Sequence, residues 1–133
     1  MNMKHKKRIT ILMADDDPDD RLLTQEALEE SRLANDINFV NDGDELMDYL
    51  HRRGKYSDPE SSPKPGLILL DLNMPKKDGR EALTEIKNDP KLRRIPVVVL
   101  TTSSISTDIG ACYDSGANSF VTKPVTLGEL ESA

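Results

Sequence analysis

Short apolar runs alternate with amphipathic segments along the whole chain. The runs predict five strands, over residues 9–14, 37–40, 67–70, 97–100 and 119–122. Runs 67–70 and 97–100 lack polar alternation, which is typical of central parallel strands that are buried on both faces. Strands that alternate with helices in this way predict a parallel sheet covered by helices on both faces.

The segments between the runs carry helix signals. Asp17 is suited to cap a helix that has Pro18 at its first position and that turns four residues toward the core, namely Leu22, Leu23, Ala27 and Leu28. Further helices are predicted over 43–53 and 79–88, and a fourth has its apolar stripe at Ile105, Ile109, Cys112 and Tyr113. The polar segment 54–65 is interpreted as a solvated surface loop, with a kinase or self-association contact as the alternative.

Composition limits the classes of protein to consider. The 133 residues are 36% hydrophobic, which suits one globular domain over 1–133 with no output domain. A single cysteine, Cys112, forms no internal disulfide and favours a cytoplasmic location. The net charge of -6 argues against a nucleic-acid partner, and the apolar run near the N-terminus is too short for an exported or membrane-inserted segment.

Chemically active side chains follow four of the predicted strands. Asp15 and Asp16 come after 9–14, Asp71 after 67–70, Thr101 after 97–100 and Lys123 after 119–122. Ligands of open parallel sheets bind beyond the carboxyl ends of the strands, so these groups are expected to share one crevice. Each residue alone has an ordinary explanation, as a turn former, a strand-end hydroxyl or a solvated lysine. Their occurrence together at four strand ends of one sheet favours a functional site.

The acidic residues of this crevice predict metal-assisted phosphoryl chemistry. Asp16 and Asp71 repel one another unless a cation lies between them, and Mg²⁺ suits one or two carboxylates combined with water and phosphate. With the charge offset, Asp71 is suited to attack phosphorus and to form an acyl phosphate. Lys123 would neutralise the phosphoryl oxygens, and the Thr101 hydroxyl would donate a hydrogen bond to one of them.

These motifs together resemble the receiver domain of two-component response regulators. The resemblance covers nearly the whole chain. It rests on Asp15-Asp16, on Asp71-x-Asn73-Met74-Pro75-x-x-Asp78-Gly79, on Pro96 to Thr101, and on Gly116-Ala117 through Lys123-Pro124. It implies a flavodoxin-like, doubly wound α/β fold, in which a five-stranded parallel sheet of order 2-1-3-4-5 lies between two helical layers. The chain departs from the family at its C-terminus, where a capping box at Thr126 leaves room for only a short fifth helix.

The resemblance also implies roles for individual residues. Asp71 would accept a phosphoryl group from a histidine of a sensor kinase. Mg²⁺ would be held by Asp15, Asp16, Asp71 and the backbone carbonyl of Asn73.

Three residues would respond to the phosphoryl group. Lys123 would contact it directly. Thr101 and Phe120 would form the switch pair, in which the hydroxyl moves to the phosphate and the aromatic ring follows.

Within the family, segments 54–65 and 75–81 resemble the small stand-alone regulators that serve phytochrome-type histidine kinases. The expected partners are such a kinase and either a downstream target or a phosphotransfer protein. A homodimer through the face of the fourth helix, the fifth strand and the fifth helix is a further expectation. The chain is not expected to be an enzyme beyond catalysing its own phosphorylation and dephosphorylation.

Two alternatives stay open at this point. A haloacid dehalogenase type of phosphatase also uses an aspartyl nucleophile, but it requires an acid/base carboxylate two residues later, where this chain has Asn73. A receiver-like module that binds protein without phosphorylation is favoured only by the short last helix.

Overall fold

The computed structural model describes residues 9–30, 35–72, 74, 79–101 and 119–122 of the 133-residue chain. Five strands form one sheet: β1 (Ile9–Ala14), β2 (Asn35–Val40), β3 (Leu67–Asp71), β4 (Val97–Thr101) and β5 (Ser119–Thr122). All four strand pairings are parallel, and the order β2-β1-β3-β4-β5 is the one predicted. The expected doubly wound α/β fold is therefore confirmed.

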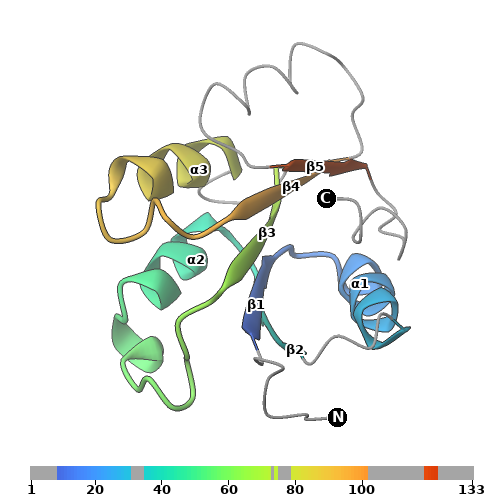
Figure 1. The fold of residues 1–133 in the computed structure, drawn as a ribbon, viewed down its shortest axis with the longest axis horizontal. Helices are drawn as coiled ribbons and strands as arrows, with labels where there is room; N and C mark the ends of the chain where they lie inside the picture. The colour runs from blue at the N-terminus through green and yellow to red at the C-terminus, as the bar shows by residue number, and fades with distance from the viewer. Residues whose placement is uncertain (1–8, 31–34, 73, 75–78, 102–118, 123–133) are drawn as a thin grey trace, which may run out of the picture.

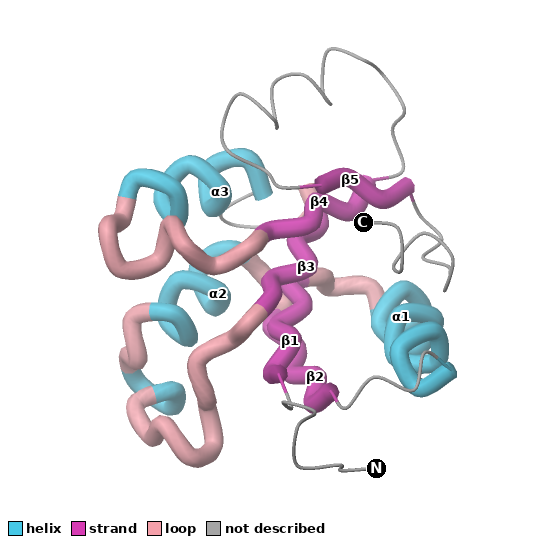
Figure 2. The backbone as a smooth tube through the Cα atoms, in the orientation of Figure 1, coloured by secondary structure: helices cyan, strands magenta, loops and turns pink. Residues whose placement is uncertain are grey.

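Helices flank the sheet on both sides. Figures 1 and 2 show α2 (Gly43–Leu50) and α3 (Gly79–Asn88) together on one face and α1 (Pro18–Glu30) on the other. Alternate residues of the strands feed two separate cores, because successive side chains of a strand point to opposite faces. Leu12, Ile68 and Val99 belong to the core on the side of α2 and α3, whereas Met13, Leu69 and Leu100 belong to the core that includes Leu28 of α1.

The first helix begins as predicted but presents a different face. The Asp17 carboxylate accepts a hydrogen bond from the Asp19 N–H at 2.9 Å, and Ala27 and Leu28 are buried. Leu22 and Leu23 are instead 57% and 43% exposed, so their predicted burial is wrong. The buried stripe runs through Thr24, Ala27 and Leu28, which share a face at i, i+3 and i+4, and this places Leu22 on the opposite side of the helix.

The second helix is shorter than predicted, whereas the third has the predicted bounds. Helix α2 ends at Leu50 rather than at residue 53, because Arg52 adopts a left-handed backbone conformation with φ of 57° and cannot continue the helix. A 3₁₀ turn, η2 (Gly54–Tyr56), follows. Helix α3 buries Ala82, Leu83 and Ile86, as its pattern predicts. The predicted fourth and fifth helices lie outside the described residues.

No helix of the described part of the chain combines the length and the apolar character that crossing a membrane requires.

Candidate functional site

Three carboxylates meet where the neighbouring strands β1 and β3 end. Parallel pairing of β1 with β3 sets Ala14 beside Leu70, so Asp15 and Asp71 leave the sheet at the same edge. Asp15 and Asp71 are 0% and 3% exposed, whereas Asp16 is exposed. One carboxylate oxygen of each of Asp15, Asp16 and Asp71 lies within 4.8 Å of the other two. The structure therefore brings together the three acidic residues that the sequence proposed for one site.

The arrangement of these carboxylates fits a divalent cation. Two unit charges no more than 4.8 Å apart repel by roughly 3 kcal/mol or more at an effective dielectric of about 20, and this repulsion acts between Asp15 and Asp71 within the buried part of the cluster. All the donor atoms are carboxylate oxygens, which hard cations such as Mg²⁺, Mn²⁺ and Ca²⁺ prefer. Among the described residues, no other cluster of His, Cys, Asp and Glu has this geometry. The geometry indicates a divalent-metal site with Asp16 on its exposed side.

Arg21 ties the acidic loop to the neighbouring strand ends. Its Nε donates to the Asp15 carbonyl at 2.7 Å, and its Nη2 donates to the Val40 carbonyl at 3.1 Å and to the Asn41 side chain. The guanidinium also lies 5.2 Å from the ring centroid of Phe39. One side chain from the first turn of α1 thus joins the C-terminal ends of β1 and β2. Sequence reasoning missed this residue, because nothing in a helical arginine indicates which carbonyls it reaches.

Gly79 allows helix α3 to start directly against the end of β3. Its N–H donates to the Leu72 carbonyl at 3.0 Å. A Cβ atom at this position would lie 2.3 Å from the Asp71 carbonyl oxygen and 2.7 Å from the Leu72 Cα. Both neighbours are backbone atoms, so a larger residue would displace the segment that carries Asp71.

The remaining predicted site residues are placed only in part. The backbone of Thr101 ends β4 and pairs with Thr122, and the backbone of Phe120 pairs with Val99, so both belong to adjacent strands. The side chains of Thr101 and Phe120 lie outside the described residues, as do Asn73 and Lys123 entirely. Their predicted roles stay predictions.

The sequence profile of the response regulator receiver domain matches residues 11–133. The chain belongs to the response regulator receiver family. The match includes all three clustered carboxylates and the whole described sheet except the first two residues of β1.

Relatives of this receiver include regulators named for phytochrome signalling. Response regulator Rcp1 of Synechocystis sp. is 48% identical over 120 residues, which make up 90% of this chain and 80% of Rcp1. The crystal structure of the phosphorylated cyanobacterial phytochrome response regulator RcpA superposes with a TM-score of 0.82 at 46% identity, covering 95% of this chain and 88% of that one. The Mn²⁺-bound form of Rcp1 superposes with a TM-score of 0.80 at 46% identity, covering 93% and 87%. The predicted resemblance to phytochrome-associated regulators is confirmed.

Proposed function

We propose that this receiver accepts a phosphoryl group on Asp71 from a phosphohistidine of a sensor histidine kinase of the phytochrome type, in a reaction that depends on Mg²⁺. The observation that supports the proposal most strongly is the cluster of Asp71 with Asp15 and Asp16 at the strand ends. The kinase class is supported by the names of the relatives, which are phytochrome response regulators.

The reaction is a transfer between two nucleophiles. A carboxylate oxygen of Asp71 attacks phosphorus, the P–N bond to the kinase histidine breaks, and the electron pair of that bond returns to the imidazole, which takes up a proton. The product is an acyl phosphate on Asp71. In the unphosphorylated structure, only 3% of the Asp71 surface is exposed.

The other site residues would orient the phosphoryl group and offset charge. Asp15, Asp16 and Asp71, with the backbone carbonyl of Asn73, would hold the cation. When bound, Mg²⁺ would supply positive charge against the carboxylates and the phosphoryl oxygens. Lys123 would neutralise a phosphoryl oxygen.

The output of the switch would be contact with another protein. The Thr101 hydroxyl would move to the phosphoryl group, and Phe120 would follow into the space that it leaves, biasing two pre-existing conformations of the face around β5. A downstream target, a phosphotransfer protein or a second copy of this chain would read that face. We place this activity in one cytoplasmic receiver domain over 1–133, and we confine its catalysis to its own phosphorylation and dephosphorylation.

Intact-mass measurement tests the proposal with a small phosphodonor. The protein is incubated with acetyl phosphate and Mg²⁺ beside Asp71→Asn and Asp44→Asn variants, the latter a matched control because Asp44 is an exposed residue of the first turn of α2. We expect one added phosphoryl group in the wild type and in Asp44→Asn and none in Asp71→Asn. Equal phosphorylation of wild type and Asp71→Asn would refute the assignment, and absence of phosphorylation in the wild type would favour a module that works without it.

A further inference from the structure

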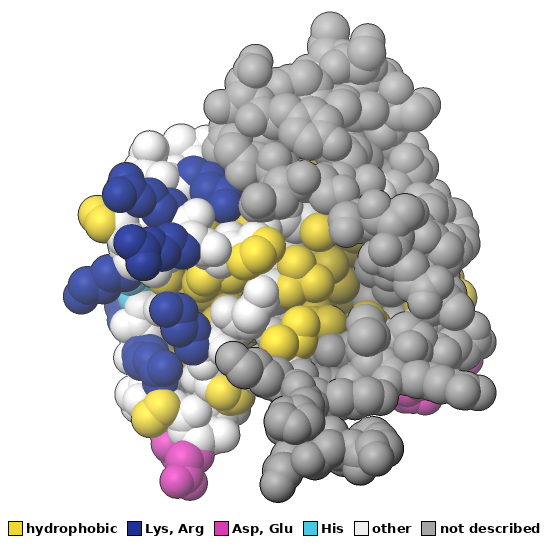
Figure 3. All heavy atoms as spheres, viewed as in Figure 1, with side chains coloured by type: hydrophobic (Ala, Val, Ile, Leu, Met, Phe, Trp, Pro, Cys, Tyr) yellow, Lys and Arg dark blue, Asp and Glu magenta, His cyan; other side chains and the backbone are white. Residues whose placement is uncertain are grey.

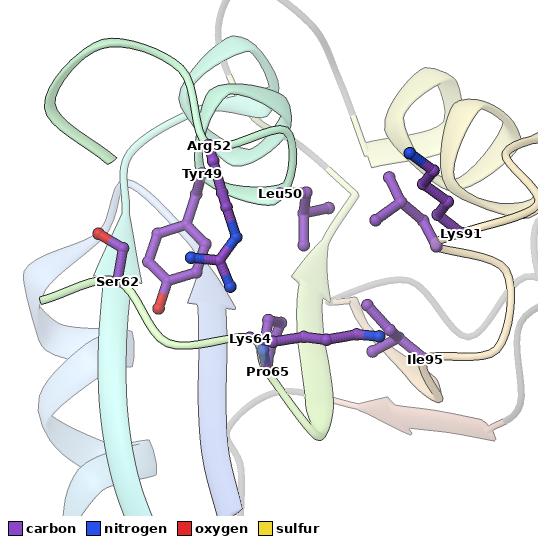
Figure 4. Close-up of a pocket in the computed structure, with 9 residues that line it drawn as sticks. Tyr49, Leu50, Arg52, Ser62, Lys64, Pro65, Lys91 and Ile95 are labelled. Carbon is purple, nitrogen blue, oxygen red and sulfur yellow. The ribbon is translucent and has the colours of Figure 1, made fainter. Parts of the chain in front are cut away.

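A pocket of about 170 Å³ opens at the edge of the sheet that lies opposite the carboxylate cluster. Its walls come from the end of α2, from the segment that leads into β3 and from the segment that leads into β4, as Figure 4 shows. Strands β3 and β4 are parallel and five residues long, so their two ends are separated by roughly 16 Å. The pocket is therefore distinct from the site that carries Asp71.

The pocket combines an apolar lining with positive charge. Leu50, Pro65, Leu92 and Ile95 supply its apolar surface. The charged residues that line it are Arg52, Lys64 and Lys91, and no acidic residue lines it.

These three cations stand out from the acidic character of the chain. The ion pairs formed between described residues, His51 with Asp89 and Arg53 with Asp48, include none of the three. Figure 3 shows lysine and arginine side chains gathered on this side of the molecule, over the helices α2 and α3. A local excess of positive charge on a chain of net charge -6 favours a negatively charged partner.

Hydrogen bonds hold the walls of the pocket in place. The Tyr49 hydroxyl donates to the Pro63 carbonyl at 2.8 Å and accepts from the Asn38 side chain at 3.1 Å. The Ser62 N–H donates to the Asp58 carbonyl at 2.9 Å, and the Gly66 N–H donates to the Thr10 carbonyl at 2.8 Å. The segment predicted as a solvated surface loop, 54–65, is thus anchored to α2 through Pro63, and Gly66, the residue after it, is anchored to β1. A pocket that is already formed loses little conformational freedom when it binds.

The volume of the pocket indicates which kind of ligand it can hold. Pockets for drug-sized ligands measure about 300–1,000 Å³, whereas a cavity of about 150 Å³ accommodates a molecule as small as benzene. At about 170 Å³, this pocket fits one apolar side chain. Its cations then lie where carboxylates that flank such a side chain can pair with them.

We propose that an acidic segment of a partner protein docks here, with one aliphatic or aromatic side chain in the pocket and neighbouring carboxylates paired with Arg52, Lys64 and Lys91. Because the pocket and the carboxylate cluster occupy opposite edges of the sheet, a side chain in the pocket leaves the carboxylate cluster open. The proposal does not depend on phosphorylation of Asp71.

NMR titration of the ¹⁵N-labelled full chain tests the proposal. The probe is a synthetic peptide, acetyl-DEDLEDE-amide, and its matched control carries serine in place of leucine. We expect saturable chemical-shift changes within residues 49–52, 62–66 and 91–95. The affinity for the peptide is expected to fall as the salt concentration is raised. The serine peptide is expected to bind at least fivefold more weakly. Equal affinity of the two peptides, or shifts confined to other residues, would overturn the proposal.

Two exposed lysines allow the charge to be removed without disturbing the core. Lys64→Gln and Lys91→Gln are each expected to weaken binding by about two- to fivefold, and the double variant by about tenfold, as for exposed ion pairs. Lys55→Gln is the control, because Lys55 lies over the ring of Tyr56 and outside the pocket. Unchanged affinity in the double variant would refute the pairing. Displacement of the peptide by equimolar inorganic phosphate or acetate would identify a small-anion site instead, and would overturn the proposal.

Discussion

Replacing Gly79 with alanine tests whether the close contact between the start of α3 and the end of β3 holds Asp71 in position. The added Cβ would lie 2.3 Å from the Asp71 carbonyl oxygen, about 1 Å less than an ordinary contact, and 3.0 Å from the Asp71 carbonyl carbon. Both are backbone atoms, so the start of α3 and the end of β3 must move apart. Overpacking of this kind costs about 1–3 kcal/mol, and the better helix propensity of alanine returns up to about 1 kcal/mol. We expect a net loss of about 1–2 kcal/mol.

Two measurements on Gly79→Ala separate stability from function. Urea unfolding followed by circular dichroism should show a midpoint lower by roughly 0.5–1 M, given the slopes usual for small domains. Mg²⁺ titration should show weaker binding, because the backbone that carries Asp71 is displaced. Gly66→Ala is the control, since its Cβ would meet only side-chain atoms of Ile9 at 3.2 Å and 3.4 Å. Wild-type Mg²⁺ affinity in Gly79→Ala would refute the reasoning about displacement.

Two further predictions follow from Arg21 and from Tyr56. Arg21→Met removes the donors to the Asp15 and Val40 carbonyls, so urea unfolding should show a loss of about 1–3 kcal/mol together with weaker Mg²⁺ binding. Arg53→Met, which breaks an exposed ion pair, should cost less than about 1 kcal/mol, and equal effects of the two variants would contradict the role given to Arg21. Burial, with the nearby Glu45 carboxylate, raises the pKa of Tyr56 above its ordinary value of 10.0, so stability should fall as pH rises above about 10, where the unfolded chain loses the proton first. Tyr56→Phe should reduce this loss of stability in urea unfolding measured from pH 8 to 11. An unchanged dependence of stability on pH would contradict the raised pKa of Tyr56.

The sheet was predictable from the sequence because its strands carry strong local signals. Strands β3 and β4 are short, continuous apolar runs, and parallel strands buried on both faces require such runs. The carboxylate cluster followed from the same logic. Asp15 directly follows β1 and Asp71 is the last residue of β3, and a parallel sheet brings the carboxyl ends of neighbouring strands to one edge.

Features that depend on tertiary contacts were not predictable in this way. Nothing in the local pattern shows that Leu22 faces outward, because several leucines of α1 compete for one buried stripe. The early end of α2 at Leu50 depends on the left-handed backbone of Arg52, a conformation that arginine seldom adopts. The link from Arg21 to the Asp15 carbonyl, and the pocket beside Lys64, arise only when distant segments pack together.

Locating the phosphoryl group tests the central claim most directly. The protein is incubated with acetyl phosphate and Mg²⁺, reduced with borohydride, which converts an aspartyl phosphate to homoserine, and then digested and analysed by peptide mass spectrometry. We predict homoserine at position 71, and none when the metal is chelated before the donor is added. Homoserine at another position, or equal conversion at position 71 without metal, would contradict the assignment of Asp71, Asp15 and Asp16 to one metal-dependent phosphoacceptor site.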